Sequence, residues 1–286
     1  MNSNWQTLHT LHPRTWHDNR FVYPVLSRRS QGISIGINLN PDKVCNFDCI
    51  YCQVDRRSEA ETRFVGIEQL LAEVGDMLER VTSGALFEDE GFRELPPEKR
   101  RLNDLAFSGD GEPTTYRNFD EIVSAVADLK RRRGLTAVKM VLITNASMLH
   151  RPVVERGLSI LDANQGEIWA KLEAGTDGYY QLVERTKIPF RQILDNIATA
   201  SQVRPLVIQS LFMRIHGEAP PADEISEFCA RLGEILQSGG RLSKVQVYTV
   251  ARTPSESFVT SLTAAELQAV ADEITATTGI LADVFP

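Results

Sequence analysis

Several features that mark whole classes of protein are absent from this sequence. No apolar stretch approaches the ~20 residues that a membrane-spanning helix needs, and the N-terminal segment shows no signal-peptide pattern. Positive charge is not in excess, because 38 acidic residues outnumber 31 basic ones and the formal net charge is -7. This charge argues against a protein built mainly to bind nucleic-acid phosphates. We therefore expect a cytoplasmic protein with no membrane partner, for which nucleic acid is not the favoured ligand.

Cysteine is also scarce, and its distribution argues against a disulfide framework. Three of the four cysteines in the chain, Cys45, Cys49 and Cys52, lie within eight residues. Such crowding is typical of metal binding in a reducing compartment. Cys229 stands alone in a stretch with helical periodicity, and we interpret it as a small buried residue.

The three crowded cysteines follow the pattern C-x3-C-x2-C directly after an apolar run and Pro41. Soft thiolate ligands select iron–sulfur clusters, zinc or Cu(I). A cubane held by three cysteines keeps one iron without a protein ligand, so a small molecule can bind there. Our hypothesis is a catalytic cluster with an open iron. A structural zinc site is the alternative, and its fourth ligand would have to be a distant residue such as a histidine of residues 9–17.

The rest of the composition is that of a soluble protein with a core. Hydrophobic residues make up 42% of the chain and charged residues 24%, and the composition shows no break that would mark a second domain. We predict an N-terminal flap over residues 1–31, which carries His9, His12 and His17, and a single domain over residues 32–286.

Hydrophobic periodicity predicts strands and helices in regular alternation. Strands are expected at Ile33–Leu39, Asp104–Phe107, Val138–Ile143, Glu167–Glu173, Leu206–Met213 and Lys244–Val250. Helices are expected at Ile67–Val81, Phe119–Arg133, Pro152–Leu161, Thr176–Glu184, Phe190–Ser201, Ala222–Leu236 and Ala264–Thr277. The last apolar piece, Ile280–Phe285, is either a strand or a cover for the body. Residues 82–103 look like an exposed insertion, and the cations Lys130–Arg133 suit the negative end of their helix.

This alternation predicts an α/β fold with a parallel sheet, either an open doubly wound sheet or a barrel. The first strand is not followed by Gly-x-Gly-x-x-Gly, which disfavours a dinucleotide-binding fold. In parallel α/β folds, ligands bind at the carboxyl ends of the strands. The unusual residues lie at those ends: the three cysteines, Gly109-Asp110-Gly111-Glu112-Pro113, Thr144-Asn145, Lys171 with Glu173, Arg214 with His216, and Tyr248 with Arg252.

At this point the residues resemble a known family. C-x3-C-x-aromatic-C after a first strand, followed by a Gly-Glu-Pro segment after the second, is similar to the radical S-adenosylmethionine (SAM) superfamily. Four shorter segments resemble its wybutosine-synthesis branch and, more distantly, the molybdenum-cofactor cyclases: Asn40-Pro41, Gly111–Thr114, Lys171–Thr176 and Tyr248–Arg252.

The resemblance implies a partial (β/α)6 barrel of the TIM type with a short C-terminal extension. It also implies one [4Fe–4S] cluster on Cys45, Cys49 and Cys52, with SAM bound to the open iron. Reductive cleavage of SAM would then allow hydrogen abstraction from an unidentified substrate. Cys229 is the one cysteine outside the motif, and a single cysteine cannot hold a second cluster. The chain therefore differs from the archaeal wybutosine enzymes, in which a second cluster is expected.

The resemblance also assigns roles to individual residues. Tyr51 would lie against the adenine, and the loop of Gly109, Asp110, Gly111 and Glu112 would hold the methionine amino group. Asp110 stands where many relatives have glycine. Lys171 would pair with the SAM carboxylate and Glu173 with the ribose, unless the two form only a structural ion pair. Asn145 and Gln209 are weaker candidates for contacts to the ribose or the substrate. An amide at the end of a strand can equally well form hydrogen bonds with backbone groups of a loop.

The expected partners follow from this chemistry. They are a small-molecule or modified-nucleotide substrate and an electron donor such as flavodoxin or ferredoxin. A partner protein is expected instead if the chain is an activating enzyme that makes a glycyl radical. The alternative from another class is a non-catalytic zinc or iron–sulfur binding protein.

Overall fold

The structure of the chain is a computed structural model that describes residues 16–56, 58–60 and 64–286. The described chain forms two compact units. The first holds the described residues of Met1–Cys45, Arg56–Ile143 and Pro152–Glu167, and the second holds Asn46–Asp55, Thr144–Arg151 and Ile168–Pro286. His9 and His12 of the expected flap lie outside the described residues.

The described residues of the first unit form four strands and three α-helices. In chain order its elements are β1 (Val22–Ser27), β2 (Gly32–Ile37), α1 (Ile67–Ser83), β3 (Leu102–Phe107), α2 (Phe119–Arg132), β4 (Lys139–Thr144, whose last residue belongs to the second unit) and α3 (Pro152–Asp162). Short 3₁₀ turns lie at Ala85–Glu88, Pro97–Lys99 and Pro113–Thr115. Strands β2, β3 and β4 are parallel, and β1 pairs antiparallel with β2.

The second unit continues the same alternation. Its elements are β5 (Gly166–Lys171, whose first two residues belong to the first unit), α4 (Asp177–Glu184), α5 (Phe190–Val203), β6 (Leu206–Leu211), β7 (Met213–Ile215), α6 (Ala222–Gln237), β8 (Leu242–Tyr248), β9 (Val259–Ser261), α7 (Ala264–Thr278) and β10 (Ala282–Phe285). Strands β5, β6, β8 and β10 pair in parallel, and β7 and β9 form a separate antiparallel ribbon. The last apolar piece of the sequence is therefore a strand.

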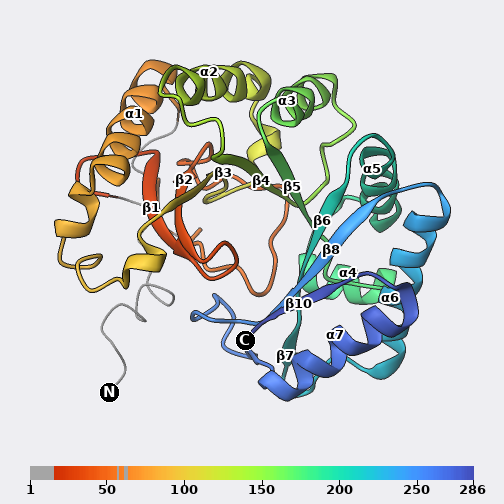
Figure 1. Cartoon of the computed structure of the whole chain (residues 1–286). Helices are drawn as coiled ribbons and strands as arrows, with labels where there is room; N and C mark the ends of the chain where they lie inside the picture. The colour runs from red at the N-terminus through yellow and green to blue at the C-terminus, as the bar shows by residue number, and fades with distance from the viewer. Residues whose placement is uncertain (1–15, 57, 61–63) are drawn as a thin grey trace. The chain divides into compact units, whose positions relative to one another are not determined.

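The helices form where apolar residues recur at helical spacing and where end signals are present. In α1 the buried residues Leu70, Val74, Met77 and Leu78 line one face, and Gly84 ends the helix with φ +89°, a conformation that glycine adopts easily. In the second unit, Thr263 and Glu266 cap the start of α7 reciprocally. Within each unit the helices lie along the outer side of the strands (Figure 1).

Two expectations about the first unit need correction. Strand β1 lies in the predicted flap, where no strand was expected. The segment 82–103 is not simply exposed, because Leu86, Phe87, Phe92 and Leu95 are buried. The many charges of this segment concealed these isolated apolar residues.

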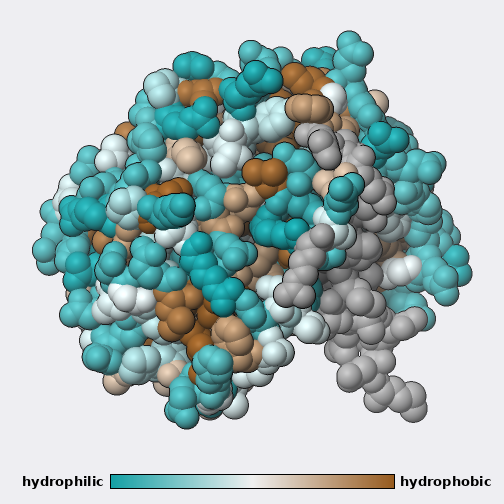
Figure 2. All heavy atoms as spheres, turned by 180° about the vertical axis from the view of Figure 1, so that it is seen from behind, coloured by the Kyte–Doolittle hydropathy of each residue, from teal (hydrophilic) through white to brown (hydrophobic). Residues whose placement is uncertain are grey.

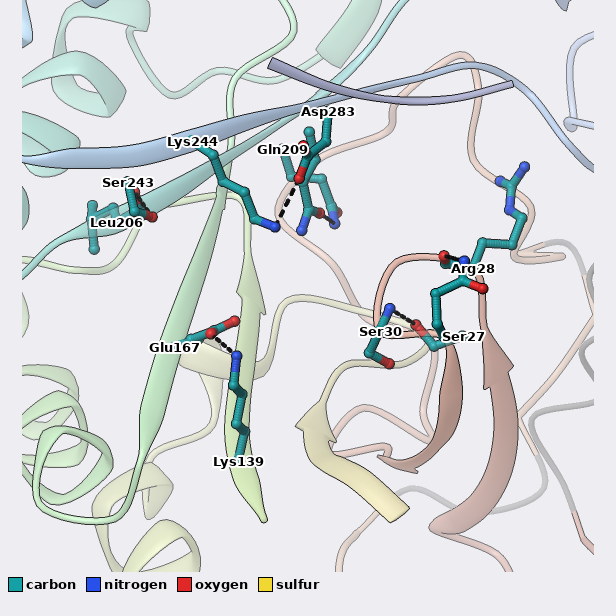
Figure 3. Close-up of polar contacts among 12 residues, drawn as sticks. Ser27, Arg28, Ser30, Lys139, Glu167, Leu206, Gln209, Ser243, Lys244 and Asp283 are labelled. Carbon is teal, nitrogen blue, oxygen red and sulfur yellow. Dashed lines mark hydrogen bonds and ion pairs between the residues drawn. The ribbon is translucent and has the colours of Figure 1, made fainter. Parts of the chain in front are cut away.

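Charged pairs lie at the amino ends of strands in both units, away from the ends that carry the candidate site. Lys139 of β4 pairs with Glu167 of β5, and Lys244 of β8 pairs with Asp283 of β10 at 2.8 Å (Figure 3). The face seen in Figure 2 is mostly hydrophilic, with small separate hydrophobic patches. None of the described helices has the length and apolar character that crossing a membrane requires.

Candidate functional site

The cysteine loop of the second unit, residues 46–55, is held against the end of helix α4. The backbone N–H of Asp48 donates to the carbonyl of Glu184 (3.1 Å), and that of Ile50 donates to the carbonyl of Val183 (2.9 Å). The last carbonyl groups of a helix have no partner inside the helix. The end of α4 therefore sets the course of the loop.

Packing orients the side chains of this loop. Ile50 and Tyr51 are buried in one hydrophobic cluster with residues of α4, β6, β7, β8 and β9: Val183, Leu211, Met213, Tyr248 and Val259. Burial of a side chain as large as isoleucine contributes about 1.5–3 kcal/mol. Because Ile50 and Tyr51 point into the core, the position of Cys49 beside them is fixed as well.

Cys49 contacts a buried carboxylate. Its Sγ lies 2.7 Å from Glu184 Oε2. Burial raises the pKa of the Cys49 thiol, and the Glu184 carboxylate raises it further. Burial also raises the pKa of Glu184, with nearby Glu173 adding to the effect. Glu184 Oε1 is buried with no hydrogen-bond partner among the described residues, so a ligand donor would remove a desolvation penalty there.

Lys171, Glu173 and Tyr51 meet beside this cysteine. Lys171 Nζ lies 3.0 Å from Glu173 Oε1 and 3.3 Å from the hydroxyl of Tyr248. The Tyr51 hydroxyl donates to Glu173 Oε1 (3.0 Å), and Lys171 Nζ sits 4.5 Å from the centre of the Tyr51 ring. Three of the residues predicted to contact SAM therefore lie together. The sequence indicated Lys171 and Glu173 from their spacing and Tyr51 only from the family motif.

The ionisation of these groups follows from burial and from their neighbours. Burial by itself lowers the pKa of Lys171, but Glu173 and Tyr248 outweigh it and the pKa is raised. Burial raises the pKa of Tyr51, and the neighbouring Cys49 and Glu173 add to it. Lys171 is therefore a cation and Tyr51 a neutral donor at neutral pH.

Asn145 lies at the start of the loop that holds the other end of the cysteine segment. Its Nδ2 donates to Asn46 Oδ1 (2.8 Å), and Asn46 Nδ2 donates to Ser147 Oγ (2.7 Å). Ser147 in turn donates to Asn145 Oδ1 through its hydroxyl (2.6 Å) and its backbone N–H (3.1 Å). These contacts are those of an amide that satisfies loop groups, and a ribose contact by Asn145 stays a prediction.

The glycine loop after β3 belongs to the first unit, where it packs against the residues that precede Cys45. A methyl group on Gly109 would overlap Asn38 Oδ1, and one on Gly111 would overlap the carbonyl oxygen of Val44. Asn38, the residue after β2, donates from its Nδ2 to Asp110 Oδ2 (2.7 Å), so the aspartate that departs from the usual glycine is held in place. Both glycines are needed because backbone approaches backbone or a short side chain there.

Glu112, at the end of this loop, is the N-cap residue of the Pro113–Thr115 turn. Its Oε1 accepts from the backbone N–H of Thr114 (3.1 Å) and from the Thr114 hydroxyl (2.5 Å). The side chain is buried. Its role toward an ammonium group stays a prediction, and its contacts here shape the Pro113–Thr115 turn.

Other sequence candidates have local partners. Arg214 pairs with Glu266, and Arg252 Nη1 donates to Gln53 Oε1 of the cysteine loop (3.0 Å). Gln209 Nε2 donates to Gln246 Oε1 (3.1 Å). Cys229 is buried in α6, as predicted.

Glu184 is the residue that sequence reasoning missed. The signal was present, because Tyr180, Val183 and Glu184 occupy one buried face of α4 at helical spacing. A carboxylate on an apolar helix face is rarely buried without a partner. The periodicity of the helix predicts this apolar face, and Glu184 is the one charged residue on it.

The donor set fits the expected cofactors. Cys45, Cys49 and Cys52 are free thiols of intermediate exposure, and thiolates suit iron–sulfur clusters. Among the residues that the structure describes, no three His, Cys, Asp or Glu side chains are gathered as ligands of one metal ion. The assignment of the three cysteines therefore rests on their spacing, and the orphaned Glu184 Oε1 supports a bound molecule nearby.

Comparison with known proteins identifies the family. The profile of the radical SAM superfamily matches residues 39–221, a range that contains the cysteine motif and the glycine loop. A UPF0026 protein of Helicobacter pylori is 25% identical over 240 residues, which cover 81% of this chain and 66% of that protein. The chain spans between 21% and 66% of the length of the curated relatives that it matches.

Solved structures agree in fold. A radical SAM methyltransferase from Sphaerobacter thermophilus has a TM-score of 0.65 at 13% identity and covers 92% of this chain and 68% of that chain. Streptococcus suis SuiB bound to S-adenosylmethionine has a TM-score of 0.54 at 11% identity and covers 90% of this chain and 48% of that chain. These likenesses confirm the predicted α/β fold with a partial (β/α)6 barrel. The family profile matches more than half of the sequence, so the chain belongs to the radical SAM superfamily.

Proposed function

We propose that this chain is a radical SAM enzyme with one [4Fe–4S] cluster on Cys45, Cys49 and Cys52, acting on a small-molecule or modified-nucleotide substrate. When bound, the cluster and SAM supply one-electron cleavage of the sulfonium and abstraction of a hydrogen atom. The observation that carries this proposal is the meeting of Cys49 with Tyr51, Lys171 and Glu173 in one group of the second unit.

The residues of this group have capacity left for a ligand. Lysine has three N–H donors, and Glu173 and Tyr248 take two of those of Lys171. The third suits the carboxylate of SAM. Glu173 is an acceptor for ribose hydroxyls, and Tyr51 offers its ring to the adenine.

The family resemblance also gives the glycine loop of the first unit a role. Backbone carbonyls accept hydrogen bonds from an ammonium, and the close packing at Gly109 and Gly111 fixes the course of this loop. We assign this loop, with Asp110 and Glu112, to the methionine amino group. The exclusion of water by the buried cluster of Ile50 and Tyr51 protects the reactive species from side reactions.

Anaerobic reconstitution with iron, sulfide, SAM and a chemical reductant tests the proposal. Wild type should yield 5′-deoxyadenosine, and Cys49→Ala should reduce both cluster content and product to background. Cys229→Ala is the matched control, because this cysteine lies buried in α6, and it should retain both. A flavodoxin or ferredoxin system should replace the chemical reductant.

Two results would contradict the proposal. One is a protein with full iron and sulfide content that makes no 5′-deoxyadenosine. The other is anaerobically purified protein that contains zinc without iron or labile sulfide, which would favour the structural alternative.

A further inference from the structure

A row of polar side chains crosses the sheet of the second unit. The strand register places Lys171 of β5 beside Gln209 of β6, Gln209 beside Gln246 of β8, and Gln246 beside Asp283 of β10. Residues paired across adjacent strands project to the same face. We call these four residues the polar row.

The polar row lies on the face of the sheet that turns away from helices α5, α6 and α7. The alternate residues Ile208, Val245 and Val247 are fully buried, and the helices of this unit lie along the outer side of its strands (Figure 1). Figure 3 shows Gln209, Asp283 and the neighbouring Lys244 projecting to one side of β6, β8 and β10. Lys171 belongs to the same face and contacts the Tyr51 ring.

Folding alone does not explain this row. Gln209 and Gln246 are only 3% and 1% exposed, and burying an amide costs more than burying leucine or methionine of similar size. The next row toward the cysteine loop is apolar or aromatic, with Leu211, Tyr248 and Phe285 in register. Two buried amides next to such an apolar row lower the stability of the core unless they bind a ligand.

The two amides leave complementary groups for a ligand. Gln209 Nε2 donates to Gln246 Oε1 at 3.1 Å. An amide has one acceptor oxygen and one donor NH₂, so Gln209 Oε1 remains as an acceptor and Gln246 Nε2 as a donor. The charges at the two ends are compensated, since Lys171 pairs with Glu173 and Asp283 pairs with Lys244.

We propose that Gln209 and Gln246 recognise the substrate by an amide-type edge, in which an N–H lies next to a C=O. Gln209 Oε1 accepts from the N–H, and Gln246 Nε2 donates to the C=O. Paired amide contacts of this kind discriminate strongly between ligand edges. Heterocyclic bases and carboxamides carry this edge.

The inference rests on the proposed function, because the row adjoins the group that we assign to SAM. Gln246 is two residues from Tyr248 along β8, a separation of roughly 7 Å. A molecule held by the glutamine pair therefore lies within one side-chain layer of the residues around Cys49.

Binding of paired probes tests the proposal without any cleavage of SAM. Saturation-transfer NMR on the full chain, reconstituted with iron, sulfide and SAM but given no reductant, measures uracil against 1,3-dimethyluracil and benzamide against N,N-dimethylbenzamide. At least one probe with an N–H should bind, and its N-methylated partner should bind at least tenfold more weakly. The uracil and benzamide arms separate a base-type substrate from a carboxamide.

Variants then locate the site. Gln246→Met should weaken the probe by about 10-fold to 100-fold. Gln246→Glu keeps the acceptor for Gln209 but lacks the ligand donor, so it should also lose binding. Gln268→Met, on the exposed face of α7, is the control and should bind as wild type.

Three results would overturn the proposal: no probe binds, N-methylated partners bind equally well, or Gln246→Met and Gln246→Glu bind as wild type. Because the measurement contains no reductant, its failure leaves the formation of 5′-deoxyadenosine as a separate question. Conversely, a protein that binds the probes but cleaves no SAM would refute the proposed function alone.

Discussion

Replacing Lys171 with methionine removes the cation of a buried ion pair and should lower the free energy of unfolding by about 3–5 kcal/mol. Lys171 Nζ lies 3.0 Å from Glu173 Oε1, and the two side chains are 19% and 3% exposed. At an effective dielectric constant of about 20, unit charges at this distance attract by about 5 kcal/mol. The substitution leaves the Glu173 carboxylate buried with the Tyr51 hydroxyl as a remaining donor.

Urea unfolding followed by circular dichroism, with every variant in the same loading state, measures this cost. The matched control is Lys139→Met, whose pair with Glu167 is 53% and 31% exposed and should be worth about 1 kcal/mol or less. Combining Lys171→Met with Glu173→Leu should recover most of the loss, because no charge is then buried alone. A loss for Lys171→Met no greater than for Lys139→Met would refute the reasoning.

The pH dependence of stability is a second test of the ion pair between Lys171 and Glu173. Burial by itself lowers the pKa of Lys171, and Glu173 and Tyr248 reverse this to raise it above the ordinary value. A raised pKa in the folded state means that the stabilisation is complete below the unfolded-state pKa of about 10.4 and is lost as the pH rises through the folded pKa. The difference between wild type and Lys171→Met should therefore stay constant from about pH 7 to 9 and shrink only above about pH 10.5.

Two further substitutions test the first unit. Gly111→Ala places a methyl group against the carbonyl of Val44 and should lower iron incorporation during reconstitution at least several-fold. Gly178→Ala is the control, because there is open space around it, and it should incorporate iron as wild type does. Equal iron incorporation by the two variants would contradict the close approach at Gly111. Lys130→Met leaves three oxygen acceptors, among them the carbonyl of Asn164, without the ammonium that they bind and should lower the free energy of unfolding by about 1–3 kcal/mol. Thermal unfolding checks this, and a melting temperature equal to that of wild type would show that water replaces the ammonium.

Local patterns in the sequence were sufficient to predict most of the strands and helices. Alternation over a strand and spacing along a helix depend on near neighbours in the chain, so the six predicted strands and the helices appear within a few residues of their expected bounds. The cysteine spacing was equally local, and the superfamily followed from it. Lys171 and Glu173 were placed together because their separation by two residues already implied a shared side.

Other features depended on partners far along the chain. Strand β1 exists because it pairs with β2. Lys130, expected among the cations that complement the negative end of its helix, is fully buried and donates to acceptors near residues 138 and 164. Nothing in a charged local segment indicates such a partner.

The cysteine motif by itself predicted three soft ligands for one metal centre and identified the superfamily. Only the tertiary structure decided what surrounds Cys49, because Glu184 reaches it from the end of a helix 135 residues later in the chain. The polar row likewise depends on register. Each strand sets the alternation of its own side chains, but hydrogen bonding between β5, β6, β8 and β10 decides which polar residues lie side by side.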